Sequence, residues 1–176
     1  NNFASGLPKF ASAVAALYKG EPVAAAIYEP LVDDLYAAER DGGATLNGDP
    51  LRATDGSSLP LDHGTVALVV GLQAVTDSEL AQQAETLELA LRDHCKRVVT
   101  TWAPCVDWGL LARGSIEGLV CFHPEQYEQH AGSLLAAEAG IDAVDTVDED
   151  GRYVGAPDTE TVDRLRQVVA GTLSGY

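Results

Sequence analysis

The sequence lacks the features of membrane proteins and of disulfide-rich secreted proteins. No stretch reaches the roughly 18 consecutive apolar residues of a membrane-spanning helix, and the longest apolar patches, such as Val66 to Leu72, are strand-sized. Asn1 to Gly6 show neither an initiator Met nor the basic and apolar parts of a signal peptide. Cys95, Cys105 and Cys121 are odd in number and lack C-x-x-C spacing, which argues against a disulfide framework and a structural zinc site. We therefore expect a cytoplasmic protein.

Positive charge is also scarce. There are three lysines, Lys9, Lys19 and Lys96, and the net charge is -16. Nucleic acid and anionic membranes would be repelled, so we expect neither as a partner. A lysine-poor, acidic surface predicts a halophilic protein, because 1 M salt shortens the Debye length to about 3 Å and weakens the repulsion between acidic groups. An ordinary acidic cytoplasmic protein is the alternative.

Apolar segments separated by short turns fill the first part of the sequence. Phe10 to Tyr18 and Val23 to Tyr28 flank Lys19-Gly20-Glu21-Pro22, a turn rich in breakers, and predict an antiparallel hairpin. Leu35 to Glu39 and Ala44 to Leu46 continue the meander. We therefore expect the first part to be mostly antiparallel sheet.

Strand and helix patterns alternate in the rest of the sequence. Apolar positions recur at helical spacing in Ser78 to His94, with Asp77 or Ser78 as the N-cap. Alternation of strands with helices predicts layered α/β packing. The other expected elements are strands Thr65 to Gly71, Arg97 to Thr101, Ile116 to Phe122 and Ala143 to Val147, and helices Cys105 to Ala112, Tyr127 to Ala139 and Thr159 to Ala170.

A polar segment rich in Gly, Ser and Pro separates the two patterns. We expect residues 1–52 to form the antiparallel sheet portion of an N-terminal lobe, residues 53–64 a linker, and residues 65–176 a C-terminal α/β lobe. With 46% hydrophobic residues the chain can bury a real core. Nucleotide-binding loops, dinucleotide fingerprints and zinc-protease motifs are absent from the sequence.

An ordered series of short motifs runs through the sequence. Its members are Asn2-Phe3, Gly6-Leu7-Pro8, Gly20-Glu21-Pro22-Val23, Tyr28-Glu29-Pro30 and Gly42-Gly43-Ala44-Thr45-Leu46-Asn47-Gly48. The series resembles the inositol monophosphatase family, which includes inositol monophosphatase and archaeal-type fructose-1,6-bisphosphatase. There, D-P-x-D-G-T-x-N-F leads into G-x-P, G-x-P-V, Y-x-P and G-x-G-A-x-x-N-G. A second block is similar to the family's V-A-x-G, W-D-x-A-A-G and E-A-G motifs, and it comprises Ala112-Arg113-Gly114, Ala131-Gly132 and Glu138-Ala139-Gly140.

The resemblance implies a fold of the α/β (α+β layered) class, a sugar-phosphatase-like α-β-α-β-α sandwich. It also implies Mg²⁺-dependent hydrolysis of phosphate monoesters, a chemistry in which carboxylate-held cations activate water and neutralise the phosphate. Asn1 corresponds to the residue directly after the Thr of D-P-x-D-G-T. We therefore expect an upstream segment to supply the principal metal ligands, and no catalytic residue is identified within this sequence. The family commonly forms dimers, which makes a homodimer one expected assembly.

Five residues are the candidates for the site. Glu128 falls on the Asp of W-D-x-A-A-G and is the expected metal ligand, although a first-turn acid that complements the helix dipole is the alternative. Trp102 and Ala103 occupy the family's small-residue turn beside the substrate. Cys121 lies near the sequence position at which many family members have a Glu that contacts the ring hydroxyl groups of the substrate. The alternative is that Cys121 is simply a small buried residue of a strand. His130, beside Glu128, could meet a phosphate or hydroxyl group or simply pack.

These observations predict a cytoplasmic, Mg²⁺-dependent phosphatase for a small phosphorylated polyol or sugar. Inositol 1-phosphate and fructose 1,6-bisphosphate are the prime candidates. The departures at Glu128, Cys121 and Trp102 also fit a diverged, non-catalytic member that binds a phosphometabolite or a protein partner. A phosphatase for sulfated nucleotides is disfavoured, because those members usually read D-G-T-K-E-F where this sequence reads Asn1-Asn2-Phe3. A structural remnant is the last alternative.

Overall fold

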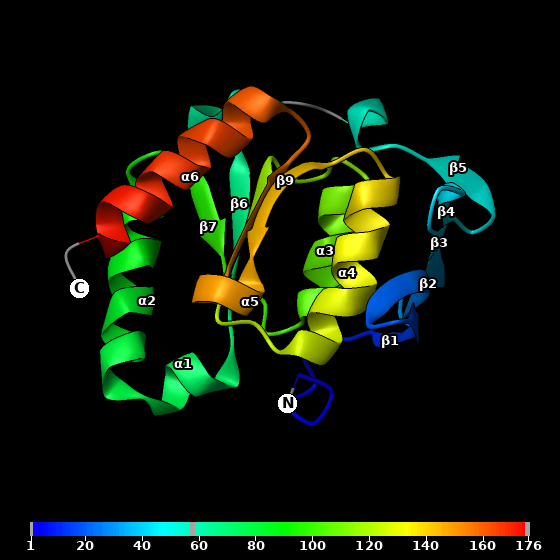
Figure 1. Cartoon of the computed structure of the whole chain (residues 1–176), viewed down its shortest axis with the longest axis horizontal. Coiled ribbons are helices and arrows are strands. Elements are labelled where there is room, and N and C mark those ends of the chain that lie inside the picture. Colours follow the sequence, from blue (N-terminus) through cyan, green and yellow to red (C-terminus); the bar gives the residue numbers. More distant parts are fainter. Residues whose placement is uncertain (1, 57–58, 175–176) are drawn as a thin grey trace. The chain divides into compact units, whose positions relative to one another are not determined.

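The computed structural model describes residues 2–56 and 59–174, so residues 57–58 of the expected linker lie outside the described part. The chain divides into two compact units, each containing one five-stranded sheet (Figure 1). The expected lobe boundaries stay a prediction. The first unit comprises residues 1–57, 101–115 and 126–141, and the second comprises residues 58–100, 116–125 and 142–176.

The first unit contains an antiparallel meander in the strand order β1-β2-β3-β4-β5. The predicted hairpin is confirmed, with Ser12 paired to Tyr28 and Ala15 to Ala25. The short final strand of this sheet was not predicted. It has only three residues, and one of them is Pro50, a residue that is uncommon within strands. The strands are β1 (Ser12–Tyr18), β2 (Glu21–Glu29), β3 (Asp34–Glu39), β4 (Gly43–Leu46) and β5 (Asp49–Leu51).

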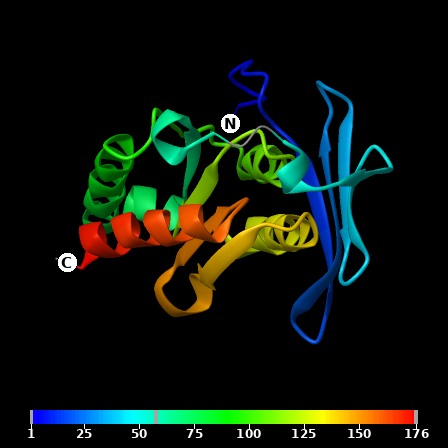
Figure 2. The same cartoon turned by 90° about the horizontal axis from the view of Figure 1, so that it is seen from above.

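Two helices, α3 (Pro104–Ala112) and α4 (Gln126–Glu138), lie on one face of this sheet (Figure 2). Glycines allow their close packing. A Cβ atom added to Gly132 of α4 would lie 2.3 Å from the indole ring of Trp108 in α3, which is 1% exposed. A Cβ atom on Gly109 would lie 2.8 Å from the ring of Tyr36 in β3. Large aromatic rings on one element therefore occupy the space left by glycines on another.

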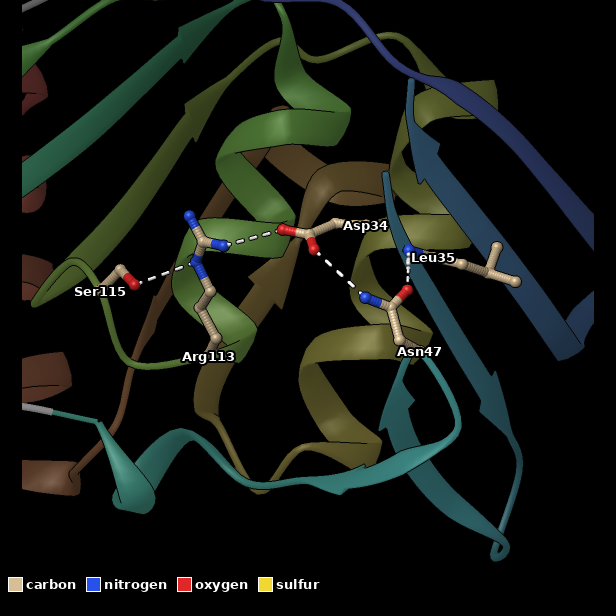
Figure 3. A network of polar contacts seen from close by, with 5 residues as sticks. All are labelled: Asp34, Leu35, Asn47, Arg113 and Ser115. Atoms are coloured by element: carbon tan, nitrogen blue, oxygen red, sulfur yellow. Dashed lines mark hydrogen bonds and ion pairs between the residues drawn. The ribbon is translucent and has the colours of Figure 1, made fainter. Parts of the chain in front are cut away.

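Charged side chains hold both helices to the turns of the sheet. At the end of α4, the Glu138 carboxylate accepts hydrogen bonds from the backbone N–H groups of Asp41 (2.9 Å) and Gly43 (2.8 Å). Figure 3 shows the tie at the end of α3, where Arg113 pairs with Asp34 at 3.2 Å. Asp34 also accepts a hydrogen bond from Nδ2 of Asn47. The C-terminal ends of α3 and α4 are thus anchored to the β3 and β4 strands.

The second unit contains a mixed sheet in the order β7-β6-β8-β10-β9, in which β6 is parallel to β7 and β8. The four strands expected here are confirmed within one or two residues at most boundaries. β10, α1 and α5 were not predicted, because each is five residues long or shorter. The elements are β6 (Thr65–Val70), β7 (Arg97–Val99), β8 (Gly118–Phe122), β9 (Asp142–Thr146), β10 (Arg152–Ala156), α1 (Leu72–Thr76), α2 (Ser78–Arg92), α5 (Val147–Asp150) and α6 (Thr159–Leu173).

The core of the second unit lies between its sheet and the helices α2 and α6. Leu87 and Leu91 of α2 and Leu165 of α6 are completely buried against strand residues such as Val120. Asp77 is the N-cap of α2, because its side chain accepts from the N–H groups two and three residues ahead, at 2.9 and 3.1 Å. The expected fold class is confirmed, with an antiparallel first portion and alternating strands and helices after it. In the described part of the chain, no helix is both long enough and apolar enough to cross a membrane.

Two helical glycines give a matched test of this packing. Gly132→Ala should lower the free energy of unfolding by about 1 to 3 kcal/mol, because the new methyl group would overlap the Trp108 ring. Gly171→Ala in α6 has open space around it and should raise that free energy by about 0.5 to 1 kcal/mol. Urea unfolding followed by circular dichroism measures both changes. Equal effects of the two substitutions would contradict the close contact between α3 and α4.

Candidate functional site

A surface depression of about 160 Å³ lies within the first unit. Its walls come from three segments: the N-terminal loop (residues 2–11), the 101–103 turn with the start of α3, and the first turn of α4. Lys9 and Glu128 are the charged side chains among the described lining residues. The lining residues are Asn2, Phe3, Lys9, Phe10, Ala11, Trp102, Ala103, Pro104, Cys105 and Glu128.

The side-chain amide of Asn2 joins two of these walls. Its Nδ2 atom donates to the carbonyl oxygens of Lys9 at 2.7 Å and Thr101 at 2.8 Å. Asn2 is 7% exposed, and its backbone carbonyl oxygen accepts hydrogen bonds from the backbone N–H groups of Ser5 and Leu7. Losing the amide would leave two carbonyl oxygens of a partly buried contact without this donor, which destabilises the contact. Asn2 therefore fixes the N-terminal loop against the 101–103 turn.

A second set of hydrogen bonds fixes the 101–103 turn itself. The Thr101 hydroxyl donates to Oδ2 of Asp107 at 2.7 Å and accepts from the Ala103 N–H at 3.1 Å. Ala103 is the N-cap residue of α3, and Trp102 has a φ of 57° in the left-handed region. Such a backbone conformation costs a bulky residue about 1 to 3 kcal/mol and persists only where neighbouring contacts hold it. Asp107 and Thr101 supply those contacts.

Aromatic rings form a large part of the lining. Phe3 and Phe10 meet edge to face, with ring centroids 5.2 Å apart. Phe3 is 76% exposed and Trp102 is 55% exposed, which is unusual for side chains of this size. A depression that combines exposed rings with one cation and one carboxylate suits a small polar molecule that also has an apolar face.

Two buried acids of the first unit have perturbed ionisation. Burial raises the pKa of Asp107 to about 7, although the Thr101 hydrogen bond and the charge of Lys9 act in the opposite direction. Burial also raises the pKa of Glu29, again against the charges of Lys9 and Arg113. Oδ1 of Asp107 and Oε1 of Glu29 are buried without a hydrogen-bond partner among the described residues. Both carboxylates therefore depend on a nearby positive charge when they ionise.

Cys105 lines the depression but is a poor nucleophile. Burial, followed by the charges of Glu128 and Asp107, raises the pKa of its thiol to about 12. The thiolate form is the reactive one, and it is not formed at neutral pH. Covalent catalysis by this thiol is therefore disfavoured.

Comparison with known proteins decides the family. The sequence model described as Inositol monophosphatase family matches residues 1–172. The chain belongs to the inositol monophosphatase family. Among its curated relatives, the Nus factor SuhB of Escherichia coli is 30% identical over 139 residues, covering 79% of this chain and 50% of that protein. The chain spans about half the length of the curated relatives it matches.

Solved structures share the fold. The inositol monophosphatase of Anabaena (Nostoc) has a TM-score of 0.83 and 20% identity, covering 99% of this chain and 70% of that one. The extragenic suppressor protein SuhB of Bartonella henselae also has a TM-score of 0.83, at 21% identity, covering 96% of this chain and 64% of that one. At these identities the likeness concerns the fold alone, and it confirms the expected sugar-phosphatase-like class.

The residues singled out from the inositol monophosphatase motifs lie in different places. Glu128 is in the first turn of α4, and it lines the depression together with Trp102 and Ala103. His130 is half-buried in the same helix and is not among the described lining residues. Cys121 belongs to β8 of the second unit, where it is 1% exposed. The structure thus brings three of the five together, and the roles of all five stay predictions.

The described residues do not complete a Mg²⁺ site of the kind the inositol monophosphatase family implies. Mg²⁺ demands near-octahedral oxygen coordination. Among residues 2–56 and 59–174, no three His, Cys, Asp or Glu side chains are grouped so that they could hold a metal ion. Glu128 is the one carboxylate that lines the depression in this part of the chain. It could supply a single ligand, and we assign no reaction step to a metal held by these residues.

Phe3, Lys9 and Phe10 are among the lining residues that the sequence did not identify as candidates. Phe3 belongs to the Asn2-Phe3 motif of the family, which does not by itself indicate a lining residue. Two features of the sequence could have indicated Lys9 as a candidate site residue. It is one of three lysines in a strongly acidic sequence, and it directly follows the Gly6-Leu7-Pro8 motif. Nothing in the local pattern shows that this lysine faces the same depression as Glu128.

Asp107→Asn should remove a pH-dependent loss of stability. Between pH 3.8 and about 7 the folded protein keeps a proton on Asp107 that the unfolded chain has released. Unfolding then releases a proton, so the free energy of unfolding falls as pH rises, by at most about 1.4 kcal/mol per pH unit. Urea unfolding across this range should show a smaller fall in the Asn variant, which becomes the more stable protein above pH 7.

The control for this experiment is Asp148→Asn, which makes the same charge change at an exposed position of α5. Its stability should follow that of the wild type at every pH. Parallel pH profiles for the wild type and Asp107→Asn would show that Asp107 does not titrate abnormally.

Proposed function

We propose that this protein hydrolyses a small phosphate monoester in the presence of Mg²⁺. Members of the inositol monophosphatase family are generally phosphatases. The observation that carries the proposal is the depression of the first unit, where Glu128 lies with Trp102 and Ala103. These are the positions at which the resemblance places a metal ligand and the turn beside the substrate. The activity of the whole protein is part of the proposal, because the chain spans only about half of its curated relatives.

In the proposed reaction, the described residues bind and orient the substrate. Asn2, Thr101 and Asp107 hold the two walls in place through their hydrogen bonds. Glu128 would hold Mg²⁺ through one oxygen ligand, because it is the one carboxylate among the described residues that line the depression. Bound Mg²⁺ would neutralise the phosphate and activate water, which is the chemistry that an inert monoester requires.

The proposed substrates are inositol 1-phosphate and fructose 1,6-bisphosphate. Both combine a phosphate with a ring that carries hydroxyl groups and some apolar surface, which matches a depression lined by a carboxylate, a lysine and aromatic rings. Trp102 is the lining residue best placed to distinguish them, because it is large and 55% exposed. The substrate contacts expected for Cys121 and His130 rest on the resemblance alone, because neither residue is among the described residues that line the depression.

The second candidate function is binding without hydrolysis, to a phosphometabolite or a protein partner. Two observations favour it. The curated relatives carry the name Nus factor SuhB, which does not describe a phosphatase. The described residues also contain no three-ligand metal group. A substrate that binds in the presence of Mg²⁺ and is not hydrolysed would identify this alternative.

Several expectations from composition accompany the proposal. The net charge of -16 supports a protein that binds neither nucleic acid nor anionic membranes and that works in concentrated salt. Three free cysteines support a cytoplasmic location. A homodimer is proposed from the resemblance alone.

Glu128→Gln tests the proposed metal ligand. Phosphate release from inositol 1-phosphate at fixed Mg²⁺ should fall by at least about 100-fold, because a neutral amide binds Mg²⁺ poorly. The assay includes molar KCl and fructose 1,6-bisphosphate as a second substrate. The matched control is Glu79→Gln, which removes an exposed first-turn acid from α2.

Turnover of Glu79→Gln should match that of the wild type. If Glu128→Gln and Glu79→Gln retain equal, near-normal turnover, the assignment of Glu128 as a metal ligand is wrong. If the wild type releases no phosphate from any sugar or inositol phosphate with Mg²⁺, hydrolysis itself is ruled out and binding becomes the leading function.

A further inference from the structure

Lys9 is the one cationic side chain among the described residues that line the depression. It belongs to a chain with 27 acidic and 11 basic residues. A phosphate monoester carries negative charge and meets repulsion from that acidic surface and from Glu128, which also lines the depression. Among the described residues that line the depression, Lys9 is therefore the source of positive charge for a bound anion.

The backbone of Lys9 is held in place. Its carbonyl oxygen accepts the Asn2 amide at 2.7 Å, and its N–H donates to the Leu7 carbonyl at 2.8 Å. The next two residues, Phe10 and Ala11, also line the depression and lead into β1. The side chain of Lys9 thus starts from a fixed point on the wall, although the residue itself is exposed.

Two buried carboxylates lie within electrostatic reach of Lys9. Its charge lowers the pKa values of both Asp107 and Glu29, which burial raises. Each of these acids has one buried oxygen without a hydrogen-bond partner in the described part of the chain. When Asp107 and Glu29 are ionised, their charges favour positions of the ammonium group near the wall over positions in open solvent.

We propose that Lys9 binds the phosphoryl group of the substrate in this depression and thereby makes it specific for phosphorylated over unphosphorylated polyols. The inference rests on the proposed function, because it names the anion-binding residue of the same site. In this arrangement the phosphoryl group lies near the ammonium group of Lys9. The competing role for Lys9 is purely structural, as the counter-ion of Asp107 and Glu29.

Binding of inorganic phosphate, measured by isothermal titration calorimetry on the full chain with and without Mg²⁺, separates these roles. Lys9→Gln should raise the Kd for phosphate at least about tenfold, the loss expected for one charge-assisted hydrogen bond. Lys9→Arg keeps the charge and should stay within about threefold of the wild type. The matched control is Lys19→Gln in the exposed turn between β1 and β2, which changes the net charge equally and should leave the Kd unchanged.

The outcomes distinguish the inference from the proposed function. Phosphate binding that is lost in Lys9→Gln and kept in Lys9→Arg and Lys19→Gln supports the inference, even if no phosphate monoester is ever hydrolysed. Equal Kd values for the wild type and Lys9→Gln overturn it, even if hydrolysis is observed. A wild-type chain that binds no phosphate at millimolar concentration, with or without Mg²⁺, also overturns it. If Lys9→Gln unfolds more readily while binding phosphate normally, Lys9 is only a counter-ion.

Discussion

The buried Nδ2 group of Asn2 donates to two carbonyl oxygens, those of Lys9 and Thr101, that belong to separate walls of the depression. Without these hydrogen bonds the exposed N-terminal loop would have few interactions to order it, because most of its residues are accessible to solvent. The loop carries Phe3, Lys9 and Phe10 into the lining. The side-chain amide of Asn2 thus joins the aromatic and cationic wall of the depression to the 101–103 turn.

Burial of charge is the second constraint on the same unit. Asp107 is 1% exposed and Glu29 is 7% exposed, so each pays a desolvation cost when it ionises. Asp107 accepts the hydroxyl hydrogen bond that holds the Trp102 turn, and Lys9 supplies a compensating charge to both acids. Shape and electrostatics of the depression are therefore coupled through the same few residues. A substitution among these residues is therefore expected to change both the stability of the unit and ligand binding in the depression.

Local patterns were sufficient for the long elements and insufficient for the short ones. The β1–β2 hairpin follows from two apolar segments around a breaker-rich turn, and α2 follows from helical spacing after the Asp77 cap. β10 and α1 carry too few residues for any periodicity to show. The family motifs identified Glu128, Trp102 and Ala103, and the structure places all three in one depression. A motif can still be located in the sequence after individual residues within it have changed. The family motifs could not identify Lys9 as a lining residue. Its proposed role depends on a hydrogen bond from Asn2 to its backbone and on two acids, Asp107 and Glu29, that are distant in the sequence.

The central claim is that the depression of the first unit is where a phosphate monoester binds. The most direct measurement is an amide ¹H–¹⁵N NMR titration of the chain with inositol 1-phosphate and Mg²⁺. The account predicts shift changes concentrated in residues 2–11, 101–106 and 126–130, including the Trp102 indole. Saturable changes confined to other segments, with these three unaffected, would contradict it.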